Sequence, residues 1–278
     1  MKATVAGALA LLVMATPAGA KVLGANGDFT YVKKSGVLPN PPFESGEAEV
    51  NCPNGTEHTG GGASAIGPPA VTYLATNGAT FDDGWIVNGW QDEIDKKKKI
   101  IAWGICTSKP AKVSDVGQNF PGAAAPASAN GIAECDSGHV VGGGASLSGA
   151  PVDWQLNSTF PIVNDDSWRV YAHHRAGGAT MFNQVFVVCM EGKAPRYVRD
   201  EIITNAEKVT RKATCRDSEA VIGGGAYVTG DTDDAHVVAT APLDTKADKD
   251  KVPDNGWKAK FYNDSGINQE FRAHAICR

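Results

Sequence analysis

The chain has 278 residues, a formal net charge of −5 and six cysteines. A mildly acidic chain argues against nucleic acid and anionic membrane surfaces as main partners. No apolar run approaches the roughly 20 residues of a membrane-spanning helix, so we expect no membrane span.

The first 20 residues predict a signal peptide. Lys2 supplies a positive charge, residues 5–15 form a short apolar run, and Ala18-Gly19-Ala20 resembles a cleavage site. Cleavage after Ala20 would remove one lysine and no acid, so the net charge would move from −5 to −6. We therefore expect a secreted protein; the alternative is an uncleaved N-terminal anchor.

One sequence motif occurs three times in the remaining chain, and we expect each copy to form one β unit. The predicted division is a linker over 21–46, a unit over 47–109, a linker over 110–130, a unit over 131–190, a linker over 191–211 and a unit over 212–278. In order, each copy holds a cysteine, a Gly-Gly-Gly-Ala segment, a tryptophan and a second cysteine. The copies are Cys52, Gly60-Gly61-Gly62, Trp85 and Cys106; Cys135, Gly142-Gly143-Gly144, Trp168 and Cys189; and Cys215, Gly223-Gly224-Gly225, Trp257 and Cys277.

The cysteines predict a disulfide framework, because an even number of them follows a signal peptide. The repeat selects one pairing, first with last within each copy: Cys52–Cys106, Cys135–Cys189 and Cys215–Cys277. Each bridge would close a loop of nearly equal length and stabilise its unit by about 4 kcal/mol.

An all-β fold is indicated, because Val, Ile, Ala, Thr and Gly carry the apolar segments. We expect about four antiparallel strands per unit, with the bridge joining first and last strands as neighbours. The units would pack as three sheets around a pseudo-threefold axis, like a prism. The alternative is a tandem row of small β-sandwiches. The charged stretch 244–254, present in the third copy alone, and the lysine run 96–99 are expected to be solvated loops.

The repeated glycines and tryptophans are predicted to be structural. The triple glycine lacks the Gly-Lys-Ser/Thr ending of a phosphate loop and the spacing of a dinucleotide fingerprint. Three residues without Cβ leave room for a neighbouring backbone or a large ring, such as the repeated core tryptophan. The acidic residues ahead of each tryptophan, such as Asp82-Asp83, predict a turn; a Ca²⁺ site is the alternative.

The sequence offers few candidates for chemistry. Trp90, Trp103 and Trp154 do not recur, so they could stack on sugars, or simply pack locally. There is no Gly-x-Ser-x-Gly elbow, no zinc spacing and no free thiol once the bridges form. We predict no catalytic residue, no metal site and no cofactor.

The pattern Cys52-Pro-Asn-Gly-Thr, Gly-Gly-Gly-Ala, Gly-Trp and Ala-x-x-Ile-Cys resembles a repeat of uncharacterised secreted bacterial proteins, notably actinobacterial ones. The resemblance covers about residues 47–278 and implies export and β structure. It implies no substrate, cofactor or catalytic residue. A more distant likeness to threefold β-prism proteins, including eggshell-layer and lectin types, concerns architecture alone.

Our preferred hypothesis is a non-enzymatic binding or structural module whose partner is a glycan or a cell-surface protein. A second hypothesis is a secreted hydrolase with a site in the second copy, using His173, His174 and Asp165. A protease-inhibitor-like binder is a third option, although no loop resembles a reactive one. The oligomeric state stays open.

Overall fold

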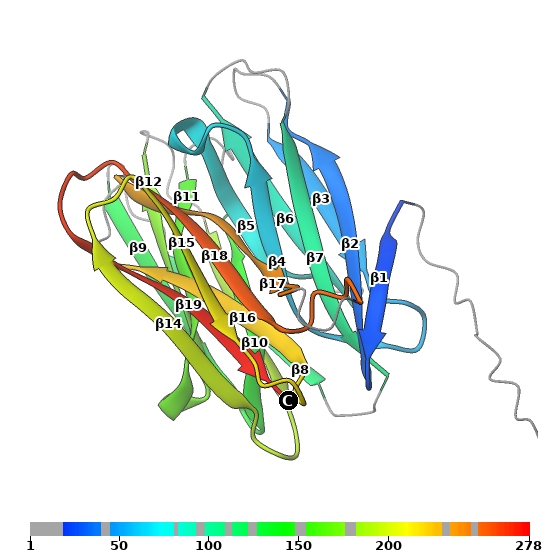
Figure 1. The fold of residues 1–278 in the computed structure, drawn as a ribbon. Coiled ribbons are helices and arrows are strands. Elements are labelled where there is room, and N and C mark those ends of the chain that lie inside the picture. The colour runs from blue at the N-terminus through cyan, green and yellow to red at the C-terminus, as the bar shows by residue number, and fades with distance from the viewer. Residues whose placement is uncertain are drawn as a thin grey trace, which may run out of the picture.

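The computed structural model describes residues 19–39, 45–80, 83–92, 98–108, 113–121, 127–147, 154–175, 182–229, 234–245 and 250–278. Residues 1–18 of the expected signal peptide, Asp82 of the first expected turn and residues 96–97 of the lysine run lie outside these ranges. The predicted all-β class is confirmed, because the described chain forms nineteen strands and two short 3-10 turns (Figure 1).

Strand β1 (Lys21–Asn26) precedes three units that each contain six strands. The first unit holds β2 (Phe29–Val37), β3 (Gly46–Asn51), β4 (Glu57–Ile66), β5 (Thr72–Thr80), β6 (Gly84–Gln91) and β7 (Lys99–Thr107). The second holds β8 (Val113–Pro121), β9 (Ala127–Glu134), β10 (His139–Ser146), β11 (Trp154–Ile162), β12 (Ser167–His174) and β13 (Phe182–Met190). The third holds β14 (Arg196–Thr204), β15 (Lys208–Thr214), β16 (Val221–Val228), β17 (Ala235–Leu243), β18 (Gly256–Asn263) and β19 (Gln269–Cys277).

The expectation of four strands per unit was wrong. The stretches read as linkers contain β1, β2, β8 and β14, and another strand runs between each glycine segment and its tryptophan. β8 and β14 lie at sheet edges, where glycine, proline and charged residues are tolerated, so their composition resembles that of a spacer.

The strands form three antiparallel sheets, and each sheet contains strands of two units (Figure 1). Sheet A has the order β1-β2-β7-β4-β17-β18-β15, sheet B the order β3-β6-β5-β10-β13-β8, and sheet C the order β14-β19-β16-β11-β12-β9. Each unit therefore gives three strands to each of two sheets, so the units are not separate sandwiches. The prism-like packing around an axis stays a prediction.

All three predicted disulfides are present, with Cα atoms 5.7 Å apart in each. Their placement differs from the expectation, because the bridged strands are not neighbours. Cys52 follows β3 of sheet B, whereas Cys106 lies in β7 of sheet A. The other two bridges join sheets B and C and sheets C and A in the same way. Each disulfide thus fastens one sheet to the next.

The middle glycine of each triplet faces the tryptophan of its own unit, as predicted. A Cβ atom on Gly143 would lie 2.4 Å from the ring of Trp168, and Gly61 and Gly224 make the same approach to their tryptophans. All three rings are fully buried. Their indole nitrogens donate hydrogen bonds of 2.7–2.8 Å to Asn77, Thr159 and Thr240.

The outer glycines of each triplet face other units. A Cβ atom on Gly144 would lie 1.7 Å from the backbone oxygen of Asn77, and Gly225 and Gly62 meet Thr159 and Thr240 in the same way. The first glycines, Gly60, Gly142 and Gly223, approach one another's backbones. Glycine is therefore needed wherever strands of different units meet.

The expected solvated insertion of the third unit is partly a core element. Residues 246–249 lie outside the described chain, but Val252, Pro253 and Asp254 are buried. A Cβ atom on Gly24 of β1 would lie 2.3 Å from a methyl group of Val252. The insertion therefore packs against the first strand. The prediction of a fully solvated loop, which relied on the charged residues alone, was wrong for this part.

The tight ring contact predicts that Gly143→Ala destabilises the protein by about 3 kcal/mol, because neither the ring nor the paired strand can move away cheaply. Denaturant unfolding would measure this. Gly55→Asn is the control, since Gly55 has positive φ with open space around it, and asparagine tolerates that conformation. Equal stability of Gly143→Ala and the parent chain would refute the packing.

Removing one inter-sheet bridge should cost about 4 kcal/mol, because the unfolded chain loses a long covalent loop. The variant is Cys135→Ala combined with Cys189→Ala, and the measurement is urea unfolding without reductant. A cost below about 1 kcal/mol would show that the bridge does not restrain the sheets.

Candidate functional site

The three sheets have the same arrangement of strands from two units, so equivalent positions can be compared between them. The residue after each Gly-Gly-Gly-Ala segment is Ser64 in sheet A, Ser146 in sheet B and Tyr227 in sheet C. Thr240, Asn77 and Thr159 accept the hydrogen bonds of the repeated tryptophans. The residue that follows the acceptor is Ala241 in sheet A, Gly78 in sheet B and Phe160 in sheet C. At these two positions aromatic residues occur in sheet C alone, whereas in sheet B the Phe186 ring of β13 lies against Gly78.

These two rings belong to an aromatic group on sheet C. The rings of Phe160 and Tyr227 meet edge to face at 4.9 Å, and His274 and Tyr171 lie 5.7 and 6.2 Å from Phe160. The guanidinium of Arg272 lies 4.6 Å above the ring of Tyr227. Such contacts fix the ring orientations.

A groove of about 390 Å³ runs beside this group. Its sides come from β11 and the turn after it, and from β14 and β19 of the next unit. The lining residues are Phe160, Pro161, Ile162, Val163, Tyr197, Val198, Arg199, Arg272 and His274. Two units therefore build the groove together.

His274 is a neutral side chain in this groove. Burial lowers the pKa of His274 to about 3, and the positive charges of Arg272 and Arg199 act in the same direction. Its buried Nε2 atom has no hydrogen-bond partner among the described residues. A buried polar nitrogen without a partner is uncommon in folded proteins.

The charges around the groove are paired. Arg272 contacts Glu270 at 2.6 Å and Glu201 at 3.4 Å, and Arg199 contacts Glu201 at 3.0 Å. Two guanidiniums and two carboxylates give no net charge but supply many donors and acceptors in fixed planes. This chemistry suits an uncharged ligand that carries hydroxyl groups.

A search of protein-family models and of curated proteins found no match to this chain. The groove's own chemistry is therefore what bears on function. Across the described ranges, no group of three or more His, Cys, Asp and Glu residues could hold a metal ion. No helix among the same residues is long and apolar enough to cross a membrane.

The non-recurring tryptophans do not form a stacking platform. Trp90 and Trp154 are 3% and 1% exposed, and the indole of Trp90 donates to the backbone oxygen of Trp154 at 2.9 Å. Trp103 is half-buried, with the Lys33 amine 4.8 Å above its ring. The local-packing interpretation fits Trp90 and Trp154, whereas Trp103 retains a partly open ring.

The residues named for a hydrolase site are not brought together. His174 is paired with Trp154 near one end of the β11–β12 hairpin, and Asp165 lies in the turn at the other end. His173 and His174 are both buried and, as strand neighbours, point to opposite faces. The second copy therefore does not assemble this triad.

The expected turns lie where the sequence places them. The backbone oxygens of Asp83, Asp166 and Asn255 accept hydrogen bonds of 2.9–3.0 Å from the amides of the opening cysteines. Asp83 and Asp166 have positive φ, as tight turns require. These hydrogen bonds join each turn to the opening cysteine of its unit.

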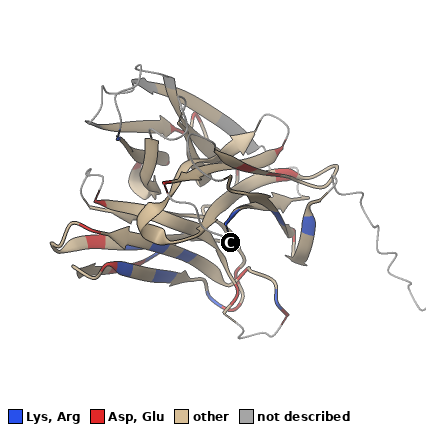
Figure 2. Ribbon diagram, turned by 90° about the horizontal axis from the view of Figure 1, so that it is seen from above, with Lys and Arg blue, Asp and Glu red and all other residues tan. Residues whose placement is uncertain are grey.

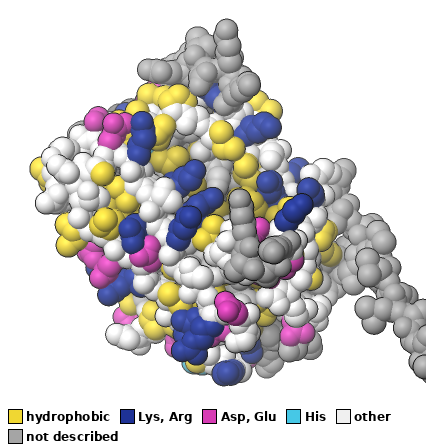
Figure 3. Space-filling model, in the orientation of Figure 1, with side chains coloured by type: hydrophobic (Ala, Val, Ile, Leu, Met, Phe, Trp, Pro, Cys, Tyr) yellow, Lys and Arg dark blue, Asp and Glu magenta, His cyan; other side chains and the backbone are white. Residues whose placement is uncertain are grey.

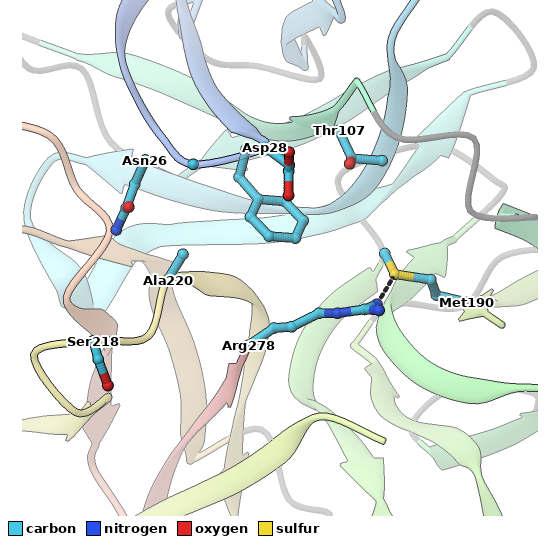
Figure 4. Close-up of a pocket in the computed structure, with 9 residues that line it drawn as sticks. Asn26, Asp28, Thr107, Met190, Ser218, Ala220 and Arg278 are labelled. Carbon is cyan, nitrogen blue, oxygen red and sulfur yellow. Dashed lines mark hydrogen bonds between the residues drawn. The ribbon is translucent and has the colours of Figure 1, made fainter. Parts of the chain in front are cut away.

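A second cavity, of about 230 Å³, lies where the three units meet (Figure 4). Thr107, Met190 and Arg278, which follow the three closing cysteines, all line it. The Arg278 guanidinium donates to the Met190 sulfur, and Asp28 faces the same space. This cavity brings one positive and one negative side chain together but no aromatic platform for a sugar beyond Phe29.

The buried neutral His274 predicts a stability that falls as the solution is acidified. The unfolded chain binds the histidine proton at about pH 6.5, whereas the folded chain does so only near pH 3. Stability from this residue is therefore complete above pH 6.5 and falls by up to about 1.4 kcal/mol per pH unit below it.

His274→Phe tests this pH dependence, since Phe186 holds the equivalent position in sheet B. Urea unfolding at pH 7, 6, 5 and 4 should show a shallower loss of stability for the variant. Identical pH profiles for both proteins would contradict a buried neutral histidine.

Proposed function

We propose that this protein is an exported, non-enzymatic glycan-binding module, and that the groove on sheet C holds an uncharged polysaccharide chain. The observation that carries the proposal is the aromatic pair of Phe160 and Tyr227 beside the groove. The equivalent seam positions of the other two sheets hold glycine, alanine and serine. At these two positions, aromatic residues are thus confined to sheet C.

Sugar rings present apolar C–H faces and equatorial hydroxyls, and the groove offers a matching surface for each. Phe160 and Tyr197 of the lining give apolar area, and Arg272, which pairs with Glu270 and Glu201 beside the groove, gives donors in a fixed plane. The groove is open at the surface, which suits a chain that continues beyond the site better than an enclosed small molecule.

A binding role fits the state of the acidic groups. Glu201 and Glu270 both contact Arg272, so their oxygens are engaged as acceptors and neither stands alone against a scissile bond. The three disulfides fit an oxidising compartment and accord with the expected signal peptide. A rigid stapled scaffold with an open groove serves recognition without a chemical step.

Tyr227→Ser should weaken polysaccharide binding at least tenfold, because it replaces the ring with the residue that Ser64 and Ser146 supply at equivalent sites. The measurement is affinity electrophoresis and calorimetry with hydroxyethyl cellulose, arabinoxylan and galactomannan, which are uncharged. At least one of them should bind the parent protein with a dissociation constant below 1 mM, or about −4 kcal/mol.

Phe186→Ser is the matched control, because it removes an aromatic ring from the outer face of sheet B. It should leave binding unchanged. An equal loss in both variants, or no retardation of the parent protein by any of these polymers at millimolar repeat units, would refute the proposal.

A further inference from the structure

The outer face of sheet A carries a concentration of lysines on two neighbouring strands. Lys212 of β15 lies directly opposite Lys258 of β18, and Lys260 lies two residues further along β18. Lys208 completes the group on β15 and pairs with Glu207 at 3.2 Å. Side chains two apart on a strand share a face, so the four amines project to one side.

Most of this positive charge is not neutralised by the protein. Within the described ranges, Lys212, Lys258 and Lys260 form no ion pair, although like charges opposite each other on a sheet are destabilising. Burial, with the nearby charges of Lys260 and Lys212, lowers the pKa of Lys258. The amines therefore repel one another in the absence of an anion.

A trough of small residues runs beside the lysines. The seam of sheet A carries Gly62 and Ser64 on β4 and Ala239 and Ala241 on β17. Beyond it, β7 and β2 present Trp103 with the amine of Lys33 above the ring. Positive charge therefore borders the trough on both sides.

A groove of about 310 Å³ lies next to this trough. Its polar lining comes from Lys208, Thr210 and Lys260, and its apolar lining includes Ile66 and Val238. Its lining crosses four neighbouring strands, β4, β17, β18 and β15, and brings Lys208 and Lys260 to one site.

Lysines and arginines are numerous on this face of the molecule. The chain is acidic overall, at −5, yet Figure 2 shows Lys and Arg on adjoining strands of this part of the fold. In Figure 3, dark-blue side chains spread over the face on which β15, β18 and β2 lie in Figure 1. The edge strand of sheet B, by contrast, presents Glu47 and Glu49.

We propose that the trough of sheet A binds a linear acidic polysaccharide, with its carboxylates between the lysines of β15 and β18 and the lysine above Trp103. Lysines on both sides of a strip of small residues fit one extended polyanion better than the plane of a bilayer. Lysine amines are compact point charges with rotatable donors, which suit carboxylates repeated along a flexible chain. This site is separate from the sheet C groove and does not depend on it.

The test uses polygalacturonate and its fully methyl-esterified form, which share a backbone and differ in charge. Polygalacturonate should bind the full-length protein at low salt, and the esterified polymer should bind at least tenfold more weakly. Combining Lys258→Gln with Lys260→Gln should raise the dissociation constant of polygalacturonate at least tenfold. The same change should lower the slope of log affinity against log salt by about 2, one per removed contact.

The matched control is Lys193→Gln with Lys251→Gln, which makes the same change in net charge at two exposed lysines outside the trough. It should change affinity less than twofold, and Tyr227→Ser should leave polygalacturonate binding intact. Equal losses in both lysine pairs, or no binding at 20 mM salt, would overturn the proposal. So would tighter binding to anionic lipid vesicles or to single-stranded DNA than to polygalacturonate.

Discussion

Close approach between backbones at the glycine triplets is the constraint on which this fold depends. One glycine makes space for an indole ring, and its neighbours let strands from other units come near enough to pair. The tryptophan acceptors Asn77, Thr159 and Thr240 are the residues whose backbone oxygens meet the third glycines. The core of each unit and its contact with the next unit are therefore determined at the same residues.

Because the same residues determine the core and the contacts between units, inward and outward positions are under different constraints. Inward positions are occupied by the same kinds of residue in every unit. They must pack against the same contact between units, the same tryptophan ring and the same disulfide. Outward positions carry no such demand, so they differ. The position three before each closing cysteine holds Trp103, Phe186 and His274, one on each sheet. We place recognition in these differences: paired charges and rings on sheet C, and lysines on sheet A.

The sequence correctly predicted the features that recur in all three motifs. The disulfide pairing, the buried tryptophans and the reason for the glycines all followed from three aligned motifs, and the structure confirms them. The number of strands did not follow, because edge strands such as β8 and β14 have the composition of spacers. Nor did the sharing of sheets between units, since strand partners far apart in sequence leave no periodic signal.

The candidate groove could be predicted only in part. Tyr227 stands out once the three glycine segments are aligned, because the other copies have serine there. Phe160 could not be recognised, because its equivalence to Gly78 and Ala241 depends on strands that the sequence did not reveal. The lysines of sheet A were hidden for a similar reason: residues in β15 and β18 become neighbours through pairing, whereas net charge sums over the whole surface.

The sharing of every sheet between two units limits how such a chain can evolve. In a row of independent modules, a duplication or a deletion leaves the remaining modules intact. Here each unit supplies strands to sheets that it shares with both other units. Loss of a unit would therefore expose the edges of two half-sheets. An added unit would find no half-sheet with which to pair. Change is therefore expected to proceed by substitution and by insertion within a unit, with the number of copies held at three.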